Sequence, residues 1–223
     1  MLEPQRGPAM EGWIARWYDR NAARRAEYFR AVAAQIAART KPGARVLEVA
    51  PGPGYLAIEL AKPGALDVAG LDISRSFVRI AQRNAARAGV SVDFQHGDAA
   101  HMPFPDASFD VLVCTAAFKN FSDPKGALDE FHRVLRPGGE ASIHDLRKEA
   151  SLAEIDAEVR HMGLSALSAV MTRWIFRHLL LRNAYARAAV ERLAARSRFE
   201  RWQLGEAGIG FELRLHKGAP ASG

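Results

Sequence analysis

The chain has 223 residues, 48% of them hydrophobic, and its 31 Lys and Arg exceed its 25 Asp and Glu, which gives a net charge of +6. This length predicts a single catalytic domain, residues 1–223, with one substantial core. Every long hydrophobic stretch is interrupted by charge and the N-terminus lacks an apolar signal-like run, so we expect no membrane span and a cytoplasmic location. The single cysteine, Cys114, excludes an intrachain disulfide, and no Cys and His cluster has metal-ligand spacing, so no metal is expected.

The basic excess does not by itself predict a nucleic-acid partner. The arginines are scattered through the sequence, without a dense basic run or an RNA-binding aromatic motif. We interpret the excess as solvated surface.

The N-terminal third leads into a glycine-rich turn. Residues 10–39 have the apolar spacing of one or two amphipathic helices, which we expect to cap the domain over 10–40. A strand over 45–50 then runs through EVAPGPG, Glu48 to Gly54, into a helix over 55–62. A tight turn between strand and helix lets backbone N–H groups approach a nucleotide-like ligand. The turn therefore predicts a cofactor site.

Glu48 narrows the choice of ligand. Gly52, Gly54 and Ala57 also satisfy the G-x-G-x-x-A dinucleotide fingerprint, so the glycines alone are ambiguous. Glu48 ends the strand beside the loop, where a carboxylate repels a pyrophosphate and favours an ammonium or sulfonium group. The alternative is that Glu48 only caps backbone amides of the loop.

Two further acidic residues follow predicted strands. Asp72 ends a strand over 66–72, 20 residues after Gly52, where a carboxylate can bind both hydroxyls of a ribose. Asp98 and Ala99 follow a strand over 91–95, where an acid and a neighbouring N–H can bind an adenine. The alternative for Asp98 is a plain turn or N-cap residue.

The remaining elements continue the alternation of strands and helices. Helices over 75–88 and 124–135 alternate with strands over 109–115 and 139–146, which predicts an open, mostly parallel sheet with its ligand at the carboxyl ends of the strands. Cys114 lies in the run FDVLVC and is expected to be a buried strand residue. After Leu146 the alternation gives way to helical spacing over 150–197, followed by two strands joined by a turn at 206–208.

The segment 162–182 carries an apolar stripe at three- or four-residue spacing: Leu164, Leu167, Met171, Trp174, Ile175 and Leu181. Core packing is the favoured interpretation. A lid over an apolar acceptor, a dimer surface and a membrane-surface helix remain alternatives, while Arg173, Arg177 and His178 argue against a spanning helix.

Four motifs, in this order and spacing, carry a family resemblance: EVAPGPG, GLDIS, GDAAHMPFPDASFDVLVC and FHRVLRPGG. Over residues 44–146 the chain resembles the class I S-adenosylmethionine-dependent methyltransferases. The resemblance implies a Rossmann-like, doubly wound α/β fold with a mostly parallel seven-stranded sheet and an antiparallel last strand. The N-terminal helices and a helical insertion over 150–184, a lid or dimer surface, would be added to it.

The resemblance also implies roles for individual residues. The methionine part of S-adenosylmethionine would be surrounded by Glu48, Ala50, Gly52 and Gly54, the ribose held by Asp72, and the adenine by Asp98 and Ala99. Four neighbours are expected to complete the cofactor contacts: Tyr18, Tyr55, Ile73 and Thr115. The family usually has glycine where this chain has Ala50, and the methyl group is tolerable there if φ is negative.

The expected reaction is in-line methyl transfer to a small organic acceptor, with natural products or quinone-like metabolites favoured. Transfer from a sulfonium needs positioning and exclusion of water more than catalytic groups. If the acceptor must lose a proton, His144 and Asp145 are the candidate catalytic residues, and side-chain alternation lets only one face the site. A structural role for His144 is an equal alternative, and His101 is a weaker candidate. The acceptor side would be lined by Phe118, Lys119 and Asn120.

Other functions remain as alternatives. A nicotinamide-dependent oxidoreductase of the short-chain type needs a Tyr followed by Lys four residues later, and none of the four tyrosines has this partner. An RNA or protein methyltransferase is harder to exclude. Base methyltransferases commonly carry an N/D-P-P-aromatic stretch after the fourth strand, where this chain has CTAAF, which favours a small-molecule acceptor. A homodimer through the helical insertion is a further expectation.

Overall fold

The computed structural model describes residues 10–161, 166–175 and 181–219. Within these residues, seven strands form one sheet in the order β3-β2-β1-β4-β5-β7-β6. Neighbouring strands are parallel except at β7, which runs antiparallel to both β5 and β6. The predicted mostly parallel sheet with an antiparallel last strand is therefore confirmed. The strands are β1 (Arg45–Val49), β2 (Asp67–Asp72), β3 (Asp93–His96), β4 (Phe109–Thr115), β5 (Leu135–Leu146), β6 (Arg201–Ala207) and β7 (Gly210–His216).

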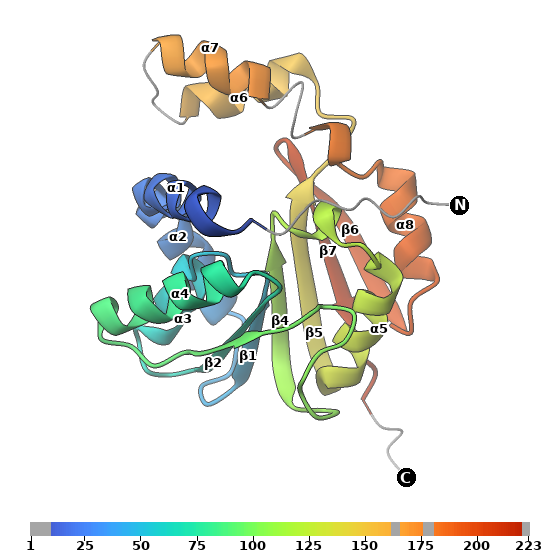
Figure 1. The fold of residues 1–223 in the computed structure, drawn as a ribbon. Helices are drawn as coiled ribbons and strands as arrows, with labels where there is room; N and C mark the ends of the chain where they lie inside the picture. Colours follow the sequence, from blue (N-terminus) through green and yellow to red (C-terminus); the bar gives the residue numbers. More distant parts are fainter. Residues whose placement is uncertain (1–9, 162–165, 176–180, 220–223) are drawn as a thin grey trace.

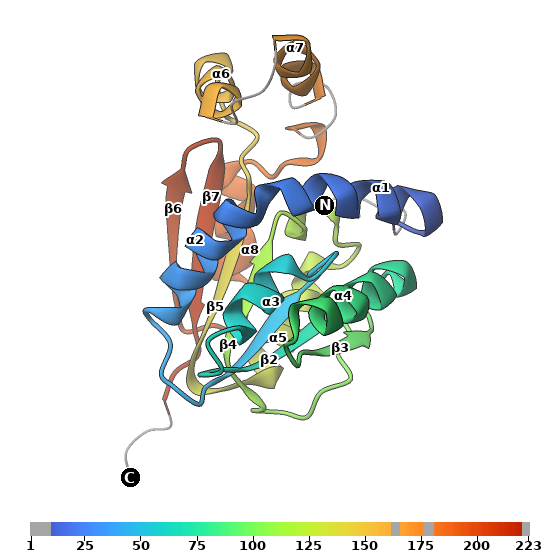
Figure 2. The same ribbon diagram turned by 90° about the vertical axis from the view of Figure 1, so that its left-hand side faces the viewer.

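Helices cover both faces of the sheet (Figures 1 and 2). One face carries α2 (Ala26–Ala37), α3 (Tyr55–Ala61) and α4 (Arg75–Ala88), with α1 (Gly12–Ala22) beside them. The other carries α5 (Pro124–Val134) and α8 (Arg187–Ala195). Beyond the upper edge of the sheet in Figure 1 lie α6 (Leu152–His161) and α7 (Ala166–Ile175). Short 3₁₀ turns are η1 (Ala23–Arg25), η2 (Phe118–Asn120) and η4 (Leu181–Asn183).

Local sequence explains where the central helices begin and end. At the start of α4 the Ser74 hydroxyl accepts a hydrogen bond from the Phe77 N–H, and the helix ends at Gly89 with φ +68°. Asp123 caps α5 through the Gly126 N–H and is followed by a proline at the first helical position. Such caps satisfy amide groups that a helix end leaves unpaired, so both elements match the predicted helices closely.

Two hydrophobic clusters fill the space between sheet and helices. Alternation along β1 sends Val46 to the cluster under α2, α3 and α4, and Leu47 to the cluster under α5 and α8. Cys114 is fully buried in the second cluster, as predicted. A smaller cluster joins Ile155 and Val159 of α6 to the turn between β6 and β7. The sheet is therefore packed on both faces.

The apolar stripe of the 162–182 segment only partly packs as predicted. Leu181 packs against the small cluster under α6, whereas Trp174 is 57% exposed. The side chains of the other four stripe residues, and those of Arg177 and His178, lie outside the described residues. Core packing is thus wrong for Trp174, whose position in α7 is beyond the edge of the sheet.

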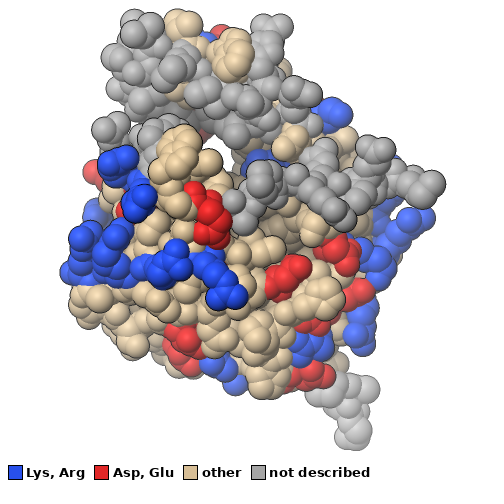
Figure 3. Space-filling model, in the orientation of Figure 1, with Lys and Arg blue, Asp and Glu red and all other residues tan. Residues whose placement is uncertain are grey.

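The arginines are less evenly spread in space than in the sequence. Arg75, Arg79, Arg83 and Arg87 are all exposed and follow one another at four-residue intervals along α4. Figure 3 shows basic side chains in a row over this part of the surface and others beside α1. The basic excess is therefore solvated, as interpreted, but on this face it is concentrated along one helix.

Candidate functional site

The glycine-rich turn after β1 has an unusual backbone. Ala50, Gly52 and Gly54 have φ angles of +57°, +55° and +82°. A Cβ on Gly54 would lie 2.7 Å from the Phe94 ring, so only glycine fits there. A methyl group at position 50 was expected to be tolerable if φ is negative, but φ of Ala50 is positive. The turn therefore holds an alanine in a left-handed conformation that disfavours side chains.

Asp72 is fixed beside this turn. Its Oδ2 accepts a hydrogen bond from the Gly52 N–H at 2.9 Å, and its Oδ1 accepts one from the Ser74 N–H at 2.8 Å. The side chain is buried, and burial raises the pKa of the carboxyl group. Each carboxylate oxygen can accept a second hydrogen bond. Asp72 is therefore oriented by the backbone while keeping the capacity to bind hydroxyl groups.

Glu48 lies deeper, under the start of α3. Its Oε2 accepts a hydrogen bond from the Ala57 N–H at 2.8 Å. Burial raises the pKa of Glu48 to about 8, while the Ala57 hydrogen bond opposes this and the charge of Asp72 adds to it. Glu48 therefore does cap a backbone amide, as the alternative interpretation holds. That Glu48 also binds a ligand stays a prediction.

A cavity of about 610 Å³ opens at the carboxyl ends of the central strands. Four of the predicted cofactor residues line it: Ala50, Ile73, Asp98 and Ala99. Ile73 is 53% exposed, and so stands at the mouth of the cavity. Asp98 also forms a turn, since its Oδ1 accepts the Ala100 N–H at 3.0 Å and its carbonyl accepts the His101 N–H.

The opposite wall of this cavity comes from the segment after β4. Asn120, Phe121, Ser122 and Asp123 line it. Of the residues predicted for the acceptor side, Asn120 lies in this wall, whereas Phe118 and Lys119 are buried behind it. Phe121, Ser122 and Asp123 were not predicted as lining residues. Their position between the end of β4 and the Asp-Pro start of α5 is the sequence feature that indicates them.

The N-terminal helices are tied to the glycine-rich turn. Tyr18 lies beside Gly52, where an added Cβ would be 3.9 Å from its ring. The Tyr55 hydroxyl donates to Asp19 Oδ1 at 2.9 Å, and the Asn84 amide donates to the same oxygen at 3.0 Å. Burial raises the pKa of Tyr55 to about 12. Sequence reasoning named both tyrosines but missed the Asp19 junction, because its partners are far apart in the chain.

The candidate catalytic residues face opposite sides of the sheet. His144 is paired in register with Thr115, and its Nε2 lies 3.8 Å from Glu212 of β7. Burial lowers the pKa of His144. Asp145 points to the other face, where its Oδ1 accepts the Lys119 ammonium group at 2.8 Å and its Oδ2 accepts the Lys119 N–H at 2.8 Å. Asp145 thus anchors the segment that forms the cavity wall.

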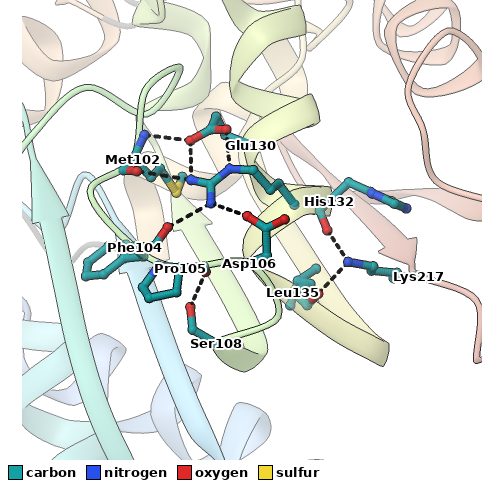
Figure 4. Close-up of polar contacts among 10 residues, drawn as sticks. Met102, Phe104, Pro105, Asp106, Ser108, Glu130, His132, Leu135 and Lys217 are labelled. Atoms are coloured by element: carbon teal, nitrogen blue, oxygen red, sulfur yellow. Dashed lines mark hydrogen bonds and ion pairs between the residues drawn. The ribbon is translucent and has the colours of Figure 1, made fainter.

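A second anchor holds residues 102–106 of the loop between β3 and β4, in the contacts drawn in Figure 4. The Arg133 guanidinium donates to both carboxylate oxygens of Glu130, at 2.6 and 2.7 Å, and to Asp106 at 2.8 Å. It also donates to the carbonyls of Met102 and Phe104, at 3.0 and 2.8 Å. These carboxylates raise the pKa of Arg133. Five contacts from one side chain fix the path of the loop from α5.

This geometry matches a known protein family. Residues 47–143 match the model of a family described as "Methyltransferase domain". Over these residues the chain is similar to methyltransferase domains. The match covers β1 to β5, including the glycine-rich turn, Asp72, Asp98 and the Arg133 anchor.

Curated relatives are similar over about half of the chain. The chain is 38% identical over 123 residues to the demethylmenaquinone methyltransferase of Deinococcus radiodurans, covering 55% of this chain and 50% of that protein. It is 43% identical over 97 residues to that of Thermus thermophilus, covering 43% of this chain and 44% of that protein. The chain thus spans about half the length of the curated relatives it matches.

Solved structures extend the likeness in fold. A Methanococcus maripaludis protein classed with S-adenosylmethionine-dependent methyltransferases is 22% identical, with a TM-score of 0.78 over 97% of both chains. A [4+2]-cyclase is also 22% identical, with a TM-score of 0.57 over 85% of this chain and 81% of that one. The fold is therefore shared by proteins of different chemistry.

The residues present fit S-adenosylmethionine, the cofactor of such domains. Asp72 offers oriented acceptors for ribose hydroxyls, and the cavity brings Asp98 and Ala99 to the same side as Ile73. At Gly54 the absence of a Cβ lets the turn pack closely against Phe94 of β3 and Ala81 of α4. No group of three His, Cys, Asp or Glu within the described part of the chain is arranged to hold a metal ion.

Proposed function

We propose that the protein transfers the methyl group of S-adenosylmethionine to a small organic acceptor. The observation that carries this proposal is the cavity, because one wall includes four predicted cofactor residues and the other consists of the segment after β4. In the proposed arrangement, Asp72 binds the ribose, Asp98 and Ala99 bind the adenine, and the glycine-rich turn with Glu48 surrounds the methionine part. The contacts of Tyr18, Tyr55 and Thr115 with the cofactor belong to the same proposal.

The chain's own residues position the reactants and exclude water. When bound, the cofactor supplies a sulfonium methyl group with an excellent leaving group, so alignment can provide much of the rate. The Asp145–Lys119 pair holds the wall after β4 in place, and the Asp19 junction ties the cap to α3 and α4. His144 and Asp145 are retained as candidate bases. The ion pair of Asp145 favours a positioning role for it, and the lowered pKa of His144 favours a neutral imidazole able to accept a proton.

A quinone-like ring is the proposed acceptor class. The relatives that are 38–43% identical are named for demethylmenaquinone. The lining is suited to a flat, apolar group, because Phe121, Ile73 and four alanines contribute to it beside a few polar side chains.

Calorimetric titration tests the cofactor half of the proposal. S-adenosylmethionine and S-adenosylhomocysteine should bind, whereas NADPH should not. Asp72→Ala should weaken S-adenosylmethionine binding by about 1.5–3 kcal/mol, because hydrogen bonds to a charged group are lost. Asp67→Ala is the matched control, since Asp67 is exposed at the far end of the same strand. Unchanged affinity in a folded Asp72→Ala variant would remove this residue from the site.

Turnover tests the acceptor half. Mass spectrometry should detect a quinone product heavier by one CH₂ unit, and His144→Ala should slow its formation if His144 is the base. His216→Ala is the control, because His216 is a half-buried histidine paired with Glu140 at the other end of the sheet edge. Rapid turnover by His144→Ala would leave it a structural residue.

The wider organisation is also proposed. We regard residues 1–223 as one domain, with 10–40 as its cap and 150–184 as an insertion that serves as lid or dimer surface. Along the described residues, no helix is both long and apolar enough to cross a bilayer. A cytoplasmic location, a homodimer and the absence of nucleic-acid binding complete the proposal, and light scattering after size exclusion tests the dimer.

A further inference from the structure

The exposed face of α4 carries a stripe of like charge. Arg75, Arg79, Arg83 and Arg87 are separated by one helical turn each and are all exposed. Like charges at this spacing destabilise a helix. Among the described residues, Arg83 alone of the four has an ion pair, with Asp19 at 3.5 Å. A helix that carries such a stripe is suited to an anionic partner.

The neighbouring helix α1, which packs on α4 through Ala15, exposes apolar side chains of its own. Trp13 is 71% exposed and Ile14 40% exposed on α1, and Met10 just before it is 38% exposed. Arg16 and Arg20, also exposed, are on the same side of the helix as Trp13, since residues three, four and seven apart share a face. The inner face of α1 is marked by Ala15 and Ala22, which are buried.

The two helices form one continuous surface. The Ser74 hydroxyl donates to the Met10 carbonyl at 2.7 Å, and the Gly12 N–H donates to the Ser76 hydroxyl at 3.1 Å. The nearby carboxylate of Glu11 accepts the Ser76 N–H at 3.1 Å. Both acidic groups on this face, Glu11 and Asp19, are therefore engaged by internal donors, and the arginines dominate its charge.

We propose that this α1–α4 face docks on the surface of an anionic lipid membrane. Trp13 and Ile14 enter the headgroup region, and the arginines of α4 contact the lipid phosphates. Exposed tryptophan and aliphatic side chains flanked by arginine are typical of helices that lie in a membrane interface. A nucleic acid would also attract the arginines, but it gives no role to Met10 and Ile14.

Docking places the mouth of the cavity at the lipid surface. Ile73, at that mouth, directly precedes the Ser74 that joins α4 to α1. A lipid-soluble acceptor can then enter the cavity from the membrane. The entry of an acceptor rests on the proposed function. The docking itself requires no cofactor.

Vesicle flotation of the full chain tests the proposal in the absence of S-adenosylmethionine. Vesicles of phosphatidylcholine with phosphatidylglycerol should bind the protein, those of phosphatidylcholine alone should bind it much less, and added salt should weaken binding. Replacing Arg75 and Arg87 together with Gln should reduce binding by roughly fivefold per arginine. The matched control replaces Arg196 and Arg198 with Gln, since these exposed residues follow α8 on the other side of the sheet.

Trp13→Ala separates insertion from charge. Because the side chain is exposed, the variant should keep its melting temperature yet bind anionic vesicles more weakly. Brominated lipids should quench the fluorescence of the parent protein more than that of the variant. Equal binding by the Arg75/Arg87 variant and its control, or no binding to anionic vesicles at low salt, would overturn the proposal. So would an RNA oligonucleotide that binds through the same arginines at lower concentration than vesicles do.

Discussion

Glu48 is a carboxyl group whose burial makes it a pH-dependent residue. Its pKa is about 8 in the folded protein and close to 4.5 when exposed in the unfolded chain. Between these values the native state keeps a proton that the unfolded state has released. The free energy of unfolding should therefore fall as pH rises through this window, by up to about 1.4 kcal/mol per pH unit.

Glu48→Gln isolates this effect. The amide keeps the shape and can still accept the Ala57 N–H, but it does not titrate. Urea unfolding between pH 5.5 and 8 should show a smaller loss of stability in the variant than in the parent. The parent and the variant must be compared at each pH, because His132 and His144 are present in both. Their lowered pKa values shift the free energy of unfolding in the opposite direction near pH 6. Parallel pH profiles would contradict the prediction.

Ala50 is strained by its backbone and not by its contacts. A left-handed conformation costs an alanine about 1–2 kcal/mol, and the greater freedom of glycine in the unfolded chain offsets part of the relief. Ala50→Gly should therefore raise the free energy of unfolding by about 0.5–1 kcal/mol, as measured with urea. Ala107→Gly is the matched control, with φ +50° at a site outside the cavity lining. Both substitutions should raise the free energy of unfolding, and only Ala50→Gly should alter cofactor affinity. A lower free energy of unfolding in Ala50→Gly would contradict the proposed backbone strain.

At the scale of elements, the loop between β3 and β4 depends on Arg133. Arg133→Gln would remove its pairing with Glu130 and Asp106 and leave the carbonyls of Met102 and Phe104 without this donor. We expect a loss of about 2–4 kcal/mol in unfolding free energy, together with weaker S-adenosylmethionine binding, because the loop carries Asp98.

The control for this element is Arg136→Gln. Arg136 is about half exposed and pairs with Asp110 near the opposite end of the strands, so its loss should cost at most about 1 kcal/mol and leave cofactor affinity unchanged. Similar losses of unfolding free energy in the two variants would show that the Arg133 contacts stabilise the protein no more than an exposed ion pair does.

The elements themselves were largely predictable, and the side-chain junctions were not. The strand over 109–115 and the helix over 75–88 were predicted with the observed bounds, because hydrophobic periodicity and capping act locally. The strand predicted over 139–146 in fact begins at Leu135, which pairs with Phe109 of β4 before a register shift, while pairing with β7 begins at Glu140. The Asp145–Lys119 pair joins residues 26 apart, so no local pattern reports it.

The same limit applies to the cofactor side chains. Motif spacing placed Asp72 beside Gly52, because both lie at the carboxyl ends of neighbouring parallel strands. It gave no sign that Ala50 would be left-handed or that Lys119 would be buried, since both depend on how the segment meets distant parts of the chain.

At the scale of the whole molecule, the N-terminal helices and the sheet meet at Asp19. This carboxylate accepts hydrogen bonds from Tyr55 of α3 and Asn84 of α4, 36 and 65 residues away, and Tyr18 beside it lies against the turn at Gly52. The junction thus connects the cap to the two elements that frame the candidate cofactor site.

Asp19→Ala should therefore loosen the cap without unfolding the sheet. The side chain accepts two hydrogen bonds and pairs with Arg83, and its loss would remove one acceptor of the buried Asn84 amide, so we expect about 1–3 kcal/mol of lost stability. Amide hydrogen exchange should accelerate across α1 and α2 while β1 and β4 stay protected. S-adenosylmethionine should bind more weakly, because Tyr18 is no longer held beside Gly52. The control is Asp129→Ala, which removes an ion pair with Lys125 on the opposite face of the sheet and should change neither hydrogen exchange nor cofactor affinity. Equal exchange rates in the two variants would contradict a role for Asp19 as the junction.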